Sequence, residues 1–274
     1  MLLSSTPLIF GNYATAATGA ANFLPNVYYP TYFDTVNEVQ RSHITTYYVT
    51  SLLNYRYSGA CYERINSSAS ITGYQTVLNT LKLSHDKGVI FSKGHRTVLN
   101  VNGYPHYGII PHPGTSYLDY EFYSVTSTNN VVTFLWHCET AYNYASNGII
   151  PKDPNGLYYG LPYCLTHNAN LGYFNTAGSQ VYLGWTNKYN FVATYPDGTQ
   201  VTHALVGSPQ YEWKINPNND YGRVAELYWY YMFSGKSTID ALNEAMKGIE
   251  GVGYGSSAIN GWLIIWGNQN LKLP

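Results

Sequence analysis

Segments of strand length alternate along this chain with segments of helical periodicity, and this alternation constrains the fold more than any other feature. Residues 70–85 repeat apolar side chains at helical spacing behind Ser70, which is a predicted N-cap. Residues 221–249 indicate two helices separated at Ser234-Gly235. Apolar, β-branched or aromatic runs predict strands within 6–11, 43–53, 87–95, 131–136, 179–187 and 261–274.

Near-continuous apolar strands interleaved with helices favour an α/β fold, in which a mostly parallel central sheet is flanked by helices. Asn102-Gly103 lies between short apolar pieces and predicts a β-hairpin within residues 100–111. No Ser/Gly/Pro-rich linker divides the chain. We therefore predict a single domain over residues 1–274, with a loop-rich insertion at 143–178.

Charged residues are scarce, with 14 Lys plus Arg against 15 Asp plus Glu and a formal net charge of −1. This balance predicts no basic surface for nucleic acid, and the absence of a long apolar run predicts no membrane span. Thirty tyrosines take the place of charge, together with many Asn, Ser and Thr. Such neutral polar surfaces favour an extracellular or cell-surface location. The segment before Arg41 has no basic residue, so we predict no secretory signal peptide there.

The three cysteines are too few for a disulfide scaffold. One bridge and one free thiol would fit an oxidising compartment. A bridge between Cys61 and Cys164 would leave Cys138 free, although the count of cysteines does not establish this pairing.

Two chemically competent residues follow predicted strands. His95 comes after GVIFSKG at the end of the predicted strand segment 87–95, and Cys138 comes after VVTFLWH, 43 positions later. Sites in open parallel sheets gather beyond the carboxyl ends of the strands. A thiolate is a strong nucleophile, and an imidazole at the neighbouring strand can act as its acid and base. The order and interval are similar to those of caspases, where the His lies about 50 residues upstream of the Cys.

Five segments resemble, in order, those of the caspase–haemoglobinase fold, and among its members the gingipain and clostripain-like cysteine peptidases. In that family one strand ends in Gly-His, the next in a Cys, and a later strand carries a Gly, as Gly184 does here. The resemblance covers roughly residues 43–274 and implies a caspase-like three-layer sandwich. The segments are VIFSKGH, VVTFLWHCETA, VYLGWTN, GKSTIDALNEAM and WLIIWGNQNLKLP.

The resemblance implies hydrolysis of peptide bonds in a peptide or protein substrate. Cys138 would attack the scissile carbonyl and His95 would protonate the departing amine. The backbone N–H groups of Cys138 and Arg96 would form the oxyanion hole. No cofactor is expected, although some relatives require calcium.

The same resemblance suggests substrate contacts and also differs from this chain at two positions. Related Arg-specific peptidases hold a basic side chain with a carboxylate, a role open to Glu139 or Asp119, and Trp185 is a third candidate for substrate contact. Arg96 stands where the family usually has Gly, and His137 where it often has Ala.

Three alternatives stay open at this point. Cys138 could be a buried, inert thiol, because free Cys is among the most buried residue types. The chain could then be a non-catalytic surface or adhesion module of the same fold. His106 and His112, with His137 or Cys138, could instead bind zinc, although their spacing matches no standard zinc motif. The sequence leaves the oligomeric state open.

Overall fold

A six-stranded sheet forms the centre of the protein in this computed structural model, which describes residues 18–25, 36–145, 148–186, 190–194, 200–204 and 223–274. The strand order is β11-β8-β7-β3-β1-β2. Every neighbouring pair in this sheet is parallel except β11 with β8. The strands are β1 (Thr18–Leu24), β2 (Cys61–Ile65), β3 (Lys87–Lys93), β7 (Asn130–Trp136), β8 (Val181–Trp185) and β11 (Leu263–Gly267).

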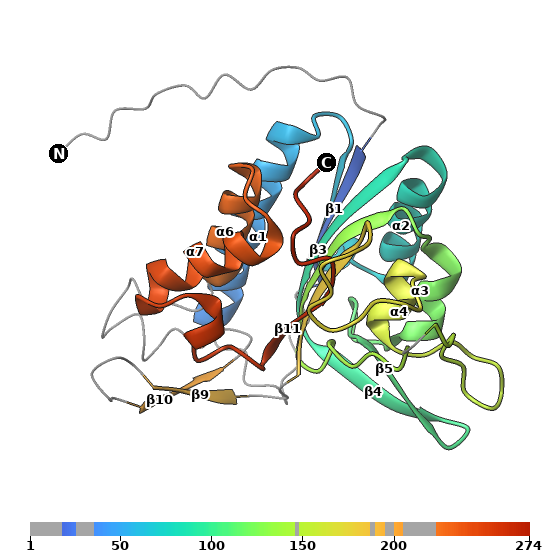
Figure 1. The fold of residues 1–274 in the computed structure, drawn as a ribbon. Coiled ribbons are helices and arrows are strands. Elements are labelled where there is room, and N and C mark those ends of the chain that lie inside the picture. Colours follow the sequence, from blue (N-terminus) through green and yellow to red (C-terminus); the bar gives the residue numbers. More distant parts are fainter. Residues whose placement is uncertain (1–17, 26–35, 146–147, 187–189, 195–199, 205–222) are drawn as a thin grey trace.

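Helices cover both faces of the sheet, so the predicted α/β class is confirmed and the architecture is consistent with a caspase-like sandwich (Figure 1). One face carries α1 (Val36–Arg56), α6 (Arg223–Phe233) and α7 (Thr238–Glu250). The other carries α2 (Ile71–Ser84), α3 (Asp119–Val125) and α4 (Leu161–Thr166). Two 3-10 turns, η1 (Asn66–Ser68) and η2 (Tyr254–Ser256), complete the described helical elements.

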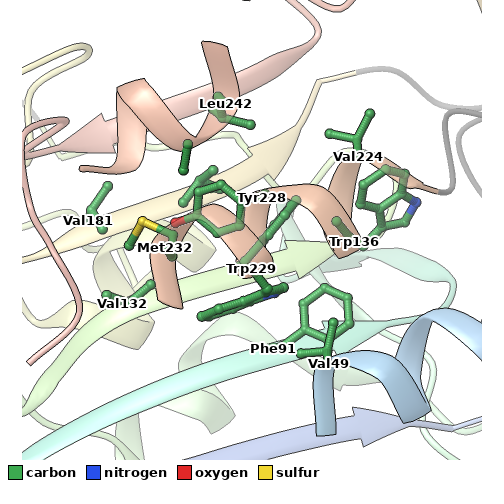
Figure 2. Close-up of a cluster of buried hydrophobic side chains, with 14 of the residues drawn as sticks. Val49, Phe91, Val132, Trp136, Val181, Val224, Tyr228, Trp229, Met232 and Leu242 are labelled. Atoms are coloured by element: carbon green, nitrogen blue, oxygen red, sulfur yellow. The ribbon is translucent and has the colours of Figure 1, made fainter. Parts of the chain in front are cut away.

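Side chains from the sheet and from α1, α6 and α7 form the first core layer (Figure 2). Trp229 of α6 is fully buried and meets Phe91 of β3 edge-on, with ring centroids 6.1 Å apart. Val49, Val132 and Leu242 join the same cluster from α1, β7 and α7. Each fully buried side chain of this size contributes about 1.5–3 kcal/mol, so this layer fixes the sheet against the helices.

The opposite face of the sheet has its own core. Tyr74 of α2 stacks on Phe23 of β1, with ring centroids 4.0 Å apart, and meets Phe122 of α3 edge-on. Leu81 and Leu135 belong to the same cluster and are nearly or fully buried. The sheet is therefore buried on both sides, which explains why its central strands are apolar throughout.

Several local predictions are confirmed. Ser70 caps α2 by accepting a hydrogen bond from the backbone N–H of Gly73. Ser237 caps α7 in the same way, and α6 and α7 are separate helices. The predicted hairpin is formed by β4 (Arg96–Val101) and β5 (Tyr104–Ile109). Asn102 and Gly103 turn it with positive φ angles of 52° and 92°, as this dipeptide does in tight hairpins.

In the described part of the chain, five strands lie outside the central sheet and form two small sheets. The two-residue strand β6 (Tyr117–Leu118) pairs with β5, so β4, β5 and β6 form a three-stranded sheet. The strands β9 (Asn190–Thr194) and β10 (Gln200–Ala204) pair with each other.

The strand predicted at 43–53 is wrong, because this segment belongs to α1. Its buried positions recur at helical spacing, with Thr45, Val49 and Leu53 facing the core while Ile44 and Tyr47 face solvent. The β-branched residues suggested a strand, but the period of burial is that of a helix. Tertiary packing here overrides β-propensity, which depends strongly on context.

The strand expected at 6–11 and the possible disulfide bridge had different outcomes. The predicted strand at 6–11 lies outside the described residues, whereas β1 and β2 were not predicted. The bridge between Cys61 and Cys164 that the sequence left open is not formed, because both thiols are free. Cys61 begins β2 at one edge of the sheet, whereas Cys164 lies in α4, which contacts β7 and β8. The structure therefore adds no disulfide to the compositional argument for an extracellular location.

Candidate active site

The segments that carry His95 and Cys138 emerge side by side from the central sheet. β3 and β7 are neighbouring parallel strands whose last paired residues are Lys93 and Trp136. The N–H of Gly94 donates to the carbonyl of Trp136 at 3.2 Å, so the two strand ends stay joined beyond the ladder. His95 and Cys138 each lie two residues past that last pair, which brings both to the same edge of the sheet.

His137 lies in a buried polar chain that joins the two strand ends. Its Nδ1 donates to the carbonyl of His95 at 2.9 Å, and its Nε2 accepts from the Ser92 hydroxyl at 2.8 Å. Ser92 in turn bonds the Tyr74 hydroxyl at 2.9 Å. Burial lowers the pKa of His137 to about 3, so the imidazole is neutral at pH 7. It therefore brings no positive charge to the thiol of Cys138.

The Cys138 thiol is enclosed. The residue is 4% exposed and belongs to the first core layer, together with Trp136 and Trp185. Burial raises the pKa of Cys138 to about 12, although the positive charge of Arg96 opposes the rise. The thiolate is the reactive form of cysteine. In this conformation Cys138 is therefore protonated and poorly accessible at neutral pH.

Arg96 and Glu139 form an ion pair beside that thiol. Arg96 Nε lies 2.9 Å from Glu139 Oε2, and the Glu139 side chain is 5% exposed. Each residue directly follows one member of the predicted dyad, His95 or Cys138. Opposite charges at the same offset from the two strand ends were a signal in the sequence. The ion pair itself was not predicted.

The backbone N–H of Arg96, which was predicted to form part of the oxyanion hole, lies on the side of β4 that faces away from β5. Ile110 N–H donates to the carbonyl of His95 at 3.0 Å, and Arg96 is in register with Ile109. This pattern makes Arg96 and Ile109 a non-hydrogen-bonded pair of the antiparallel ladder. β4 is an edge strand. The Arg96 N–H therefore points away from β5, so the ladder does not use this predicted oxyanion donor.

The turn after Cys138 is anchored by neighbouring strands. Tyr182 of β8 donates from its hydroxyl to the carbonyl of Thr140, and Trp266 of β11 donates from Nε1 to the carbonyl of Ala141. Gly184 lies directly beneath this turn, where an added Cβ would stand 3.0 Å from the Thr140 carbonyl carbon. The glycine of the VYLGW motif is thus required for the turn to approach β8.

The three predicted substrate-contacting side chains are all buried. Glu139 is engaged by Arg96, and Trp185 packs against Trp136 with ring centroids 5.0 Å apart. Asp119 is fully buried and is bonded to His106 and to the backbone N–H of Gly160. Trp185 belongs to the same core layer as Cys138, and Glu139 is the next residue in the chain.

A second buried histidine, His106, lies between two carboxylates. Its Nδ1 is 2.7 Å from Asp119 Oδ1, and its Nε2 is 3.6 Å from Asp153 Oδ2. Burial opposes protonation of His106, but its hydrogen bond to Asp119 and the negative charges of both carboxylates outweigh burial and raise the pKa of His106. This His106 clamp connects β5 and α3 to the predicted insertion, where Asp153 lies.

The histidines named for a zinc site are used in other ways. His106 bonds Asp119, and both ring nitrogens of His137 have partners, whereas the bridge that His112 forms with Ser70 is between backbones. Among the residues that the structure describes, no group of three or more His, Cys, Asp or Glu side chains is arranged to hold a metal ion. Within the same residues, no helix has the length and apolar character to cross a membrane.

Comparison with known proteins adds no relative. No protein-family model matches the chain, and no curated protein matches it significantly.

Proposed function

We propose that this protein is a cysteine peptidase of the caspase–haemoglobinase type, similar to gingipains and clostripain, acting on a peptide or protein substrate. The observation that supports this most is the pairing of β3 with β7, whose ends carry His95 and Cys138 at one edge of a mostly parallel sheet. Functional residues of such sheets gather at this position.

In the proposed reaction, the Cys138 thiol gives its proton to His95, and the thiolate sulfur bonds to the scissile carbonyl carbon. The oxyanion accepts hydrogen bonds from the backbone N–H groups of Cys138 and Arg96, each worth roughly 10²–10³ in kcat. The tetrahedral intermediate collapses with cleavage of the C–N bond, and His95 protonates the departing amine. His95 then takes a proton from water, which attacks the thioester and releases the acid and the thiol.

The alternative is a catalytically silent binding module with the same fold. Its support is the enclosure of Cys138, which is 4% exposed and has a pKa raised by burial to about 12. Arg96 also stands in place of the usual Gly of the family, and it is held in an ion pair with Glu139, the residue after Cys138.

Labelling with peptidyl acyloxymethyl ketones, read by intact mass, tests the proposal. The panel comprises wild type, Cys138→Ala, His95→Ala and Arg96→Gly, the last of which restores the residue usual in the family. A peptidase gives a single adduct that is lost in Cys138→Ala and weakened in His95→Ala, with Arg96→Gly at least as reactive as wild type. No adduct on any variant, across probes with different P1 residues, while iodoacetamide still reaches Cys138, would establish the silent module.

We further propose an extracellular or cell-surface location, which the scarcity of charge and the abundance of neutral polar groups support. Antibody detection on intact cells and in the medium, compared with lysed cells, tests this. Labelling with and without EDTA tests the calcium requirement that some relatives have.

A further inference from the structure

One face of the β4–β5 hairpin carries both Arg96 and Tyr107. Arg96 is in register with Ile109, and Val98 is in register with Tyr107. Residues directly opposite each other in an antiparallel pair project to the same face, as do residues two apart on one strand. Arg96 and Tyr107 therefore project from the same face of the hairpin, with Arg96 at the end nearer the candidate site.

The turn after Cys138 contacts this face twice. Glu139, the residue after Cys138, forms the ion pair with Arg96 at 2.9 Å. Tyr142, three residues later, contacts Tyr107 with ring centroids 4.8 Å apart. The turn thus runs along the hairpin, and the two tyrosines meet where the segments that follow the two predicted catalytic residues lie against each other.

Tyr107, Tyr142 and Tyr144 form an aromatic platform that is partly open to solvent. Tyr142 is 38% exposed, and the other two are half-buried. The rings of Tyr107 and Tyr144 lie 6.4 Å apart. The backbone beside Tyr142 is fixed, because the Ala141 N–H donates to the carbonyl of Trp185 at 3.1 Å. A binding surface that is already ordered loses little entropy when a ligand binds, so the platform is preorganised.

The platform lies within reach of a peptide held at the candidate site. Tyr107 is in register with Val98, three residues past His95, so the Cα atoms of His95 and Val98 are at most about 11 Å apart. Tyr142 is four residues past Cys138, so their Cα atoms are at most about 14 Å apart. An extended peptide advances about 3.3 Å per residue, and a side chain about four residues from the scissile bond therefore reaches the platform.

The chemistry of the platform favours an uncharged side chain. The two carboxylates predicted to hold a basic side chain are engaged elsewhere, since Glu139 pairs with Arg96 and Asp119 is fully buried against His106. Tyrosine rings instead pack against aromatic and large apolar groups. An aromatic ring of the substrate would extend the stacking that is already present on the platform.

We propose that the platform of Tyr107, Tyr142 and Tyr144 is a substrate subsite that receives an aromatic or large apolar side chain of the peptide. This assignment rests on the proposed peptidase function and names the substrate class of the same site. It replaces the expected preference for a basic side chain.

Tetrapeptidyl acyloxymethyl ketones test the subsite. Each probe carries Phe or Lys at one position and Ala at the others, and the rate of adduct formation at Cys138 is divided by that of the all-Ala probe. Wild type should prefer Phe over Lys at one position by about tenfold, as stacking and burial of one aromatic side chain allow. Tyr142→Ala should lose this preference. Tyr142→Phe should keep it, because the ring makes the contact.

Tyr230→Ala is the matched control. Tyr230 is 46% exposed and lies on α6, which covers the other face of the sheet, so this variant should keep the preference of wild type. An equal Phe preference in wild type and Tyr142→Ala would overturn the subsite. A Lys preference that is lost in Tyr142→Ala would also overturn it, because the platform would then bind a cation over its rings.

Peptide binding separates the subsite from the peptidase function. If no ketone labels any variant, the function fails, and fluorescence anisotropy of dye-labelled Phe and Lys tetrapeptides then tests the subsite. The proteins are Cys138→Ala and the double variant that also carries Tyr142→Ala. Tighter binding of a Phe peptide that is lost in the double variant would support the subsite, whereas equal affinities would overturn it. Labelling of Cys138 without a Phe preference would support the function and overturn the subsite.

Discussion

Two buried histidines, His137 and His106, differ in charge although they are equally hidden from solvent. His137 is 1% exposed and His106 is 0% exposed. The pKa of His137 is lowered to about 3, whereas that of His106 is raised. Burial disfavours the charged form of both imidazoles, so burial alone cannot explain the difference.

The partners of each ring explain it. His137 meets a hydroxyl and a carbonyl, which satisfy a neutral imidazole with one N–H. His106 meets the carboxylates of Asp119 and Asp153, which stabilise an imidazolium. The ends of β3 and β7 are thus joined by hydrogen bonds between neutral groups. The predicted insertion at 143–178 is instead attached through the charged contacts of His106 with Asp119 and Asp153. The two regions should respond in opposite directions to pH.

The largest effect is expected from removing the charge of Asp119. Asp119→Asn leaves the buried His106 without its closest carboxylate, and breaking such a pair costs about 3–5 kcal/mol. Urea denaturation at about pH 6, where His106 is protonated, measures the loss of unfolding free energy. The control is Glu244→Gln, whose exposed ion pair with Lys247 contributes about 0–1 kcal/mol. Equal losses in the two variants would show that His106 is not charged.

The second prediction concerns acid denaturation through His137. Its pKa is about 3 in the folded protein and 6.5 in the reference state, so the unfolded chain binds a proton that the folded chain does not. The free energy of unfolding therefore falls as pH drops below 6.5, by about 3 kcal/mol on reaching pH 4. His137→Gln should show a smaller fall over the same range in urea titrations. Parallel curves for wild type and variant would contradict the neutral, buried state of His137.

The sequence predicted those parts of the fold that depend on local pattern. The apolar runs that predicted β3 and β7 and the N-cap predicted at Ser70 are local signals. The structure contains both strands and the cap. α1 was missed because its buried face carries Thr45, Thr46 and Thr50 where apolar residues would mark a helix. A single sequence gives β-branched residues no preference between a strand and such a helix face.

The positions of the candidate site residues could be predicted from the sequence, but their chemical states could not. The position of His95 and Cys138 at strand ends follows from strand order, which sequence patterns indicate. Their chemical state depends instead on contacts across the chain. Neither the neutrality of His137, which its burial sets, nor the enclosure of Cys138 follows from local pattern. Partners that lie far apart in the sequence decide whether each group is charged.

A third, smaller effect is expected from Ser92→Ala. This change leaves His137 Nε2 and the Tyr74 hydroxyl without their common partner, and an unsatisfied buried polar group costs about 1–3 kcal/mol. Thr80→Ala is the control, because the Thr80 hydroxyl lies on the exposed side of α2 and bonds the carbonyl of Thr76. Urea denaturation at pH 7 measures both variants. If Ser92→Ala loses no more unfolding free energy than Thr80→Ala, then water replaces the Ser92 hydroxyl. The hydrogen bonds between Tyr74, Ser92 and His137 would then be accessible to water.

The smallest effect is expected from the pH dependence of the His106 clamp, because burial of the imidazole partly cancels the attraction of its carboxylates. The folded pKa of His106 lies above the reference value of 6.5. The stability that its charge contributes is therefore complete below 6.5 and is lost as the pH rises through the folded pKa. The difference in unfolding free energy between wild type and His106→Gln should thus shrink as the pH rises above 6.5. This trend is opposite in sign to that of His137, whose neutral form is favoured as the pH rises. Histidine proton shifts in NMR spectra over the same range provide an independent measurement, and a His106 signal that titrates below 6.5 would remove the contrast between the two regions.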